Sequence, residues 1–204
     1  MRFDQVPSWR IAEDEGWDLT AALFIRDVAG LRDRDHAADP PALSPAVPTD
    51  RELRDSIDPS TAGRAWRSWW STLLRDRTAV TPRDDPRARL RWAASGTAFG
   101  GWSEEVWRSA FAWADQRKRD QIEQVVARAD RARNDRLAVG RIVAAVVETL
   151  GRPARPFDLT ITTLPVAGTW THRPDEHQVL VSEALRADPA TLGDVLRPVL
   201  GELA

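Results

Sequence analysis

The hydrophobic period of the sequence changes from helical to strand-like after Gly151, and this change limits the folds open to the chain. Before it, apolar residues recur every three or four positions, the pattern of helices with a buried face. After it, Phe157 to Leu164 alternates apolar and polar residues and is rich in β-branched side chains, which predicts a strand. Helices first and strands afterwards predict a mainly α-helical α+β fold.

The helices expected before Gly151 are placed by their apolar stripes and by capping residues. They are a helix from Asp18 as N-cap to about Leu31, a short one from Thr49 to Ile57, one from Ser60 or Thr61 to about Arg77, and a long helical region from Ser103 to Leu150. Asn134 and Gly140 are poor helix formers, so we expect a break or a bend near Asn134 to Gly140. Residues 1–16 are expected to be extended or irregular.

The C-terminal part is expected to form a β-hairpin followed by a final helix. Trp170 begins the return segment, and His177 to Ser182 reads as the second strand through Val179 and Val181. Asp188 or Pro189 then starts a helix that has one apolar face.

The length of 204 residues suits one domain that covers residues 1–204. The alternative is a subdivision into an N-terminal helical part, 1–101, and a part with the long helix, the hairpin and the last helix, 102–204. Four prolines between residues 35 and 49 exclude a helix or a central strand there, so this segment is expected to be a solvated loop.

The composition excludes several classes of protein. There is no cysteine, which rules out disulfides and thiolate sites. The first residues lack the apolar stretch of a secretory signal, and the run from Ile142 to Val147 is too short to span a membrane. We therefore expect a cytoplasmic protein. Its basic residues are arginines apart from Lys118, which is typical of a GC-rich bacterium or its phage.

Charge is unevenly distributed along the chain. Residues 1–60 carry 7 basic and 13 acidic groups, residues 61–155 carry 19 and 11, and residues 156–204 carry 3 and 7. Either the acidic ends fold over the basic middle and neutralise it, or the middle faces a polyanion. The arginines that would bind nucleic acid in the second case are Arg83, Arg87, Arg89, Arg91, Arg128, Arg131 and Arg133. Aspartates among them favour the first interpretation.

Ten tryptophans and no tyrosine make up an unusual aromatic set. Trp66, Trp69 and Trp70 share a helical face with two leucines, whereas the arginines between them lie opposite, so these tryptophans are predicted to be core residues. Outside this stripe, the candidates for exposed anchors that bind a protein partner are Trp9, Trp17, Trp102, Trp107 and Trp170.

No familiar catalytic, phosphate-binding or metal-binding motif occurs in the sequence. His172 and His177 flank Asp175 and Glu176, which are ligand types for zinc, but Pro174 predicts a turn there and no further ligands lie nearby. We therefore expect neither a metal nor a cofactor.

The pair formed by Val179 to Ser182 and the helix from Leu192 to Ala204 resembles the strand and helix of minimal zinc metallopeptidases. In that family the helix carries His-Glu-x-x-His. The counterpart here is Gly201-Glu202-Leu203-Ala204, which lacks both histidines. The resemblance implies at most a relative without the zinc site.

The sequence therefore favours a non-catalytic protein that binds another protein or itself, as a subunit, adaptor or regulator. Nucleic-acid binding through residues 61–155 is the alternative, and an enzyme whose site is assembled only by folding is the third. No membrane role is expected.

Overall fold

The computed structural model describes residues 9–32, 39–78, 87, 90, 91, 94, 102–127, 129–152 and 154–204. These residues combine helices with a four-stranded sheet, and a strand–strand hairpin followed by helices ends the chain, which confirms the α+β prediction. None of the described helices is both long and apolar enough to cross a membrane.

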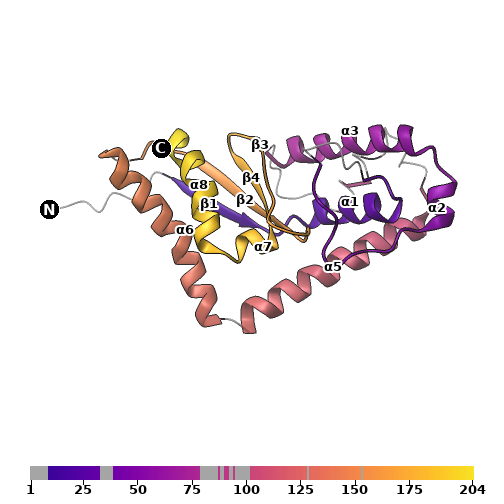
Figure 1. Cartoon of the computed structure of the whole chain (residues 1–204), viewed down its shortest axis with the longest axis horizontal. Coiled ribbons are helices and arrows are strands. Elements are labelled where there is room, and N and C mark those ends of the chain that lie inside the picture. The colour runs from indigo at the N-terminus through magenta and orange to yellow at the C-terminus, as the bar shows by residue number, and fades with distance from the viewer. Residues whose placement is uncertain are drawn as a thin grey trace. The chain divides into compact units, whose positions relative to one another are not determined.

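The chain divides into two compact units (Figure 1). Unit 1 contains residues from 1–14, 121–163 and 168–204, and unit 2 contains residues from 15–120 and 164–167. The expected single domain, and its alternative division after residue 101, stay predictions, because compactness does not show which parts unfold together.

The sheet belongs mainly to unit 1 and has the order β1-β2-β4-β3. Its strands are β1 (Arg10–Asp14), β2 (Asp158–Leu164), β3 (Thr171–Asp175) and β4 (Gln178–Ser182). β1 pairs in parallel with β2, with Arg10 opposite Asp158 and Asp14 opposite Thr162. β3 and β4 form the predicted antiparallel hairpin.

One expectation for these strands becomes more specific and one is wrong. Residues 10–14 are a regular strand because their backbone pairs with β2, which is distant in sequence and leaves no local signal. Pro174 lies inside β3 and not in a turn. β3 is an edge strand, where a residue without an N–H is tolerated.

The core of unit 1 lies between the sheet and three helices: α6 (Ala129–Leu150), α7 (Glu183–Arg186) and α8 (Pro189–Leu203). Leu159 and Ile161 of β2 and Val179 and Val181 of β4 share one face of the sheet, because side chains two apart on a strand point the same way. α6 and α8 lie side by side on that face (Figure 1).

The start of α8 and the end of α6 lie where the sequence predicts them, whereas α6 has no break inside it. Asp188 caps α8 by accepting from the amides of Ala190 and Thr191, and Gly151 adopts a φ of +63° directly after α6. A break near Asn134 to Gly140 does not occur, because α6 is continuous from residue 129 to residue 150, whereas a bend there stays a prediction. The interior glycine costs about 1 kcal/mol at most, too little to break so long a helix.

Unit 2 is built around α1 (Trp17–Val28). Ten consecutive residues of α1, from Asp18 to Asp27, are buried, so the helix is enclosed on all sides rather than on one face. The predicted N-cap is displaced, because Gly16 in a left-handed conformation holds that position and Asp18 lies in the first turn. Asp18 accepts instead from the amide of Leu19.

The described part of the proline-rich segment, 39–49, is not simply a solvated loop. Leu43 is 1% exposed and forms an isolated bridge with Val166. The buried guanidinium of Arg26 donates to the carbonyls of Pro40 and Pro41, at 2.5 and 2.7 Å. Prolines cannot donate from their own nitrogen but keep their carbonyls, so an arginine inside the unit fixes the segment.

The remaining helices of unit 2 carry the tryptophan core. They are α2 (Arg51–Asp55), α3 (Pro59–Thr78) and the first part of α5 (Glu104–Ala127). The predicted stripe of α3 is buried: Trp66, Trp69, Trp70, Leu73 and Leu74. Asp58 caps α3 through the amides of Ser60 and Thr61, one position ahead of Pro59, so neither predicted cap is correct.

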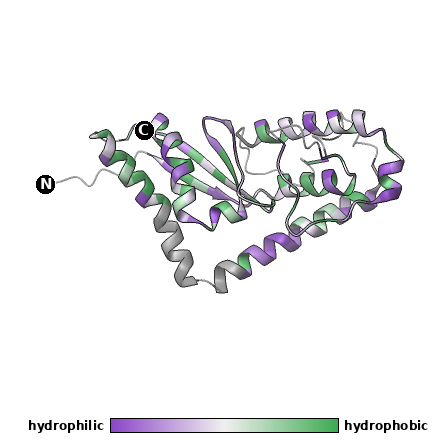
Figure 2. Ribbon diagram, viewed as in Figure 1, coloured by the Kyte–Doolittle hydropathy of each residue, from purple (hydrophilic) through white to green (hydrophobic). Residues whose placement is uncertain are grey.

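α5 crosses from unit 2 to unit 1 after Asp120. Between Trp113 and Ile122 it holds no apolar side chain except Ala114, and this hydrophilic stretch is visible in Figure 2. Its side chains bond to one another, as in the contacts of Gln116 and Arg117 with Asp120. Contacts of this spacing stabilise a helix that is polar on most of its surface.

Candidate functional site

A surface groove of about 510 Å³ lies in unit 2 on one face of α5. The residues of α5 that line it are Glu104, Arg108, Phe111, Ala112 and Asp115. Their spacing of three or four positions places them on one side of a helix. The sequence pattern therefore brings two carboxylates, one guanidinium and one aromatic ring together along α5.

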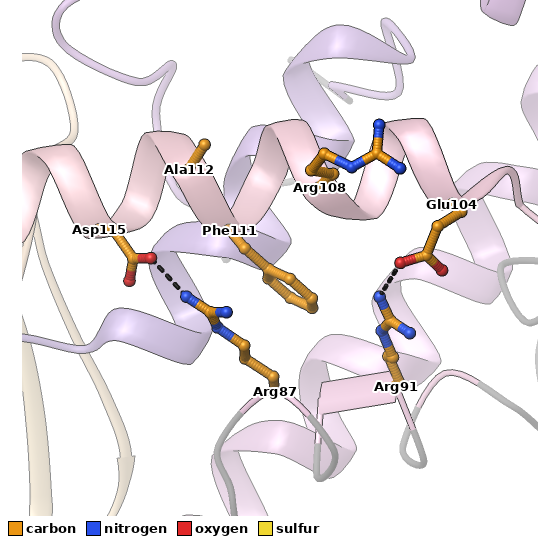
Figure 3. A pocket seen from close by; sticks show the side chains of 7 residues that line it. All are labelled: Arg87, Arg91, Glu104, Arg108, Phe111, Ala112 and Asp115. Atoms are coloured by element: carbon orange, nitrogen blue, oxygen red, sulfur yellow. Dashed lines mark hydrogen bonds and ion pairs between the residues drawn. The ribbon is translucent and has the colours of Figure 1, made fainter.

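Arg87 and Arg91 form the opposite wall of this groove. Residues 87, 90, 91 and 94 are helical, and Leu90 and Ala94 are fully buried. This anchoring places both arginines beside α5. Arg87 contacts Asp115 at 2.6 Å and Arg91 contacts Glu104 at 2.7 Å (Figure 3).

The ring of Phe111 lies between the two guanidinium groups of that wall (Figure 3). The Cζ atoms of Arg87 and Arg91 are 5.5 and 5.3 Å from the ring centroid, within cation–π range. Phe111 is only 6% exposed, because the two arginines and the core cover it. Each guanidinium is thus held by a carboxylate at its edge and by an aromatic ring at its face.

Arg108 is the third cation of the groove and differs from the other two. Its side chain is exposed, and among the described residues no carboxylate or other acceptor contacts it. Among the described lining residues, three arginines face two carboxylates, so one of their positive charges has no counter-charge within this set. The arrangement can therefore accept one anionic group while the other charges stay paired.

The five tryptophans predicted as exposed anchors occupy different places. Trp107 is 5% exposed and meets Trp69 edge-on at 5.9 Å, so it is a core residue and not an exposed anchor. Trp9, Trp17, Trp102 and Trp170 are partly buried.

Three of these partly buried rings have aromatic neighbours inside their own unit. Trp17 stacks on Phe111 and donates from Nε1 to Asp115. Trp9 stacks on Phe157, and Trp170 stacks on His172. Since none of the described tryptophans is a fully exposed ring, a role in partner binding stays a prediction for them.

Of the arginines proposed for nucleic acid, two have side chains that the structure describes. Arg87 and Arg91 are adjacent in the groove, where each is paired with a carboxylate. Arg83, Arg89 and Arg128 lie outside the described residues, and of Arg131 and Arg133 the backbone in α6 alone is described.

The histidines do not form a metal site in the part of the chain that is described, which contains no group of three potential ligands. His177 contacts Glu176 at 3.3 Å and the carbonyl of Asp158 at 3.1 Å. Burial lowers the pKa of His172, because a desolvated imidazole holds a proton less well. Glu202, in the tetrapeptide compared with the metallopeptidase motif, pairs with Arg173.

Sequence reasoning missed Glu104, Arg108, Phe111 and Asp115 as site residues. The sequence signal that could have identified them is the recurrence of charged residues at helical spacing around Phe111. The apolar stripe of the same helix made this recurrence difficult to recognise. No protein-family model matches the chain, and neither a curated protein nor a solved structure is significantly similar to it.

Proposed function

We propose that this chain is a protein-binding protein, a subunit, adaptor or regulator, and that its partner binds at the groove of unit 2. The observation that supports this most is the arrangement of Arg87, Phe111 and Arg91 beside Arg108, which has no partner among the residues that the structure describes. Arginine and aromatic side chains dominate the energetics of protein interfaces, and here they are already held in place. Pre-ordered side chains lose less entropy on binding.

The mixed charge of the groove favours a protein over a nucleic acid. Glu104 is 63% exposed and Asp115 is 33% exposed, and both line the same groove as the arginines. A phosphate backbone would meet these negative charges, whereas nucleic-acid sites gather unopposed cations. A protein surface can offer both charges and apolar groups. We place this interaction in the cytoplasm, as the sequence leads us to expect.

The test compares Arg108→Glu with Arg119→Glu. Both arginines are exposed on α5, but Arg119 does not line the groove and bonds only to Gln116 of its own helix. Tagged wild-type protein and both variants are purified from the source cells under gentle conditions. We expect one protein, in stoichiometric amount, to accompany the wild type and Arg119→Glu but not Arg108→Glu.

Two results would contradict the proposal. If no protein is retained by the wild type, the proposal that this chain binds a protein is wrong. Retention of nucleic acid, released steeply as salt rises and reduced by Arg108→Glu, would assign the groove to a polyanion instead. Circular dichroism of each variant checks that the charge reversal has left the fold intact.

A further inference from the structure

We infer that the segment bound in the groove presents a carboxylate side chain to Arg108 and an aromatic side chain to the outer face of Arg91. This inference rests on the proposed function and names the chemistry of the partner. It commits to an acidic and aromatic peptide segment of another protein, rather than to a free anion or a nucleic acid.

We assign the carboxylate because the three arginines of the groove differ in whether they already have an ion-pair partner. Arg87 and Arg91 already have carboxylate partners at 2.6 and 2.7 Å, so a ligand gains little by replacing them. Arg108 has no such partner among the described residues, and its planar guanidinium suits a carboxylate in two-point contact. One singly charged group therefore balances the charges of the described lining residues.

The single uncompensated charge also argues against a phosphate group. A phosphate carries between one and two negative charges near neutral pH. Its second charge would lie in the same groove as Glu104, whose carboxylate is 63% exposed. An aspartate or glutamate of the partner carries only one charge, so it avoids most of this repulsion.

The aromatic side chain is assigned from the geometry around Phe111. One face of the Arg91 guanidinium is directed at the Phe111 ring, 5.3 Å from its centroid. The side chain of Arg91 is still 42% exposed, so a second ring can reach part of it from solvent. A guanidinium held by a carboxylate keeps a fixed plane, which favours stacking of a ring on it.

The size of the groove agrees with side chains of a peptide. Ligand pockets commonly measure about 300–1,000 Å³. The groove, at about 510 Å³, has room for the ends of a few side chains.

The experiment selects peptides from a displayed random library on the immobilised full-length chain. We expect the wild type to enrich peptides in which aspartate or glutamate is close to an aromatic residue. A synthetic peptide of the enriched sequence is then titrated by fluorescence polarisation. Arg108→Glu should weaken its binding at least about tenfold, the scale of one buried charge contact, and Arg119→Glu should leave it unchanged. Arg91→Lys should weaken aromatic-containing peptides more than matched peptides with alanine in place of the ring.

Several results would overturn the inference. They are enrichment without acidic residues, equal binding by Arg108→Glu, full displacement of the peptide by inorganic phosphate, and failure to enrich any peptide. A protein partner that is captured from cells and is insensitive to Arg108→Glu would leave protein binding standing but move it away from this groove. Capture of no protein at all would instead defeat the proposed function.

Discussion

The indole nitrogen of Trp17 lies 2.8 Å from Oδ1 of Asp115, and the other oxygen of this carboxylate accepts from Arg87 at 2.6 Å. One carboxylate thus connects the start of α1, the middle of α5 and the arginine wall of the groove. Trp17 also stacks on Phe111 at a centroid distance of 5.5 Å. The aromatic centre of the groove and its charged edge are therefore held by the same residues.

The first prediction concerns this shared carboxylate. Asp115→Ala removes the acceptor of two donors, so we expect the free energy of unfolding to fall by about 1–2 kcal/mol. Asp115→Asn keeps an acceptor for Trp17 but loses the ion pair, and should lose less. Urea unfolding measures both. Asp120→Ala is the matched control on α5, because Asp120 bonds only within its own helix. An equal loss in Asp115→Ala and in the control would show that the bridge contributes nothing.

The second prediction concerns Arg26, whose side chain is 0% exposed. It pairs with Asp27 at 2.8 Å, donates to two proline carbonyls and lies over the ring of Trp66. Arg26→Met leaves Asp27 and both carbonyls without this donor in a buried place. We expect the free energy of unfolding to fall by about 3–5 kcal/mol, the cost of breaking a buried ion pair.

Arg32→Met provides the control for this change. Arg32 also approaches the Asp27 carboxylate, at 3.6 Å, but its side chain is 43% exposed. Its loss should cost less than about 1 kcal/mol, as for exposed ion pairs. Urea unfolding of the two variants under the same conditions gives the comparison. Similar losses would mean that the contacts of Arg26 with the loop are unimportant.

The burial of Arg26 could not be predicted from the sequence, although the helix that carries it could. The apolar stripe of residues 19–31 predicts a helix with one buried face, and the helix is present. Arg26 and Asp27 are charged, which favours exposure, yet both are buried, because residues 40–43 fold back onto them. Local periodicity indicates which face of a helix is apolar. It does not report which charged pairs a distant loop will cover.

The groove could be predicted only in part for a similar reason. Arg87 and Arg91 stand out in the sequence as part of a basic cluster, for which a phosphate backbone is the alternative to neutralisation by acidic residues. Their partners are 28 and 13 residues away, at Asp115 and Glu104, and only the fold brings them together. The pairing changes the electrostatics of the cluster. The sequence could identify the arginines, whereas the character of the site depends on tertiary contacts.

The third prediction separates two stacked tryptophans of α3. Trp66 and Trp70 are both buried, with ring centroids 5.2 Å apart. Trp66 also donates from Nε1 to the carbonyl of Ala22 at 3.1 Å and lies under Arg26. Trp66→Phe loses this hydrogen bond as well as volume, so we expect it to cost about 1 kcal/mol more than Trp70→Phe. Thermal or urea unfolding tests this order, and the reverse order would contradict it.

The last prediction is a pH dependence that arises from His172. Burial of the imidazole lowers its pKa below the ordinary value of 6.5, so the folded state binds the proton less readily than the unfolded state. The contribution to stability is therefore complete above pH 6.5 and is lost as the pH falls through the lower pKa of the folded state. His172→Gln lacks this dependence, so the stability advantage of the wild type over the variant should shrink as the pH falls below 6.5.

Two measurements check this prediction independently. NMR titration of the histidine rings, with His172 assigned by its absence in the variant, should give a midpoint below 6.5. Urea unfolding of the wild type and His172→Gln between neutral and mildly acidic pH should show the shrinking difference. The ring stacks on Trp170 at 6.1 Å and is half-buried, so water screens part of the effect and the change should be modest. A midpoint at or above 6.5, or an advantage that grows on acidification, would mean that the protonated ring is stabilised in the folded protein.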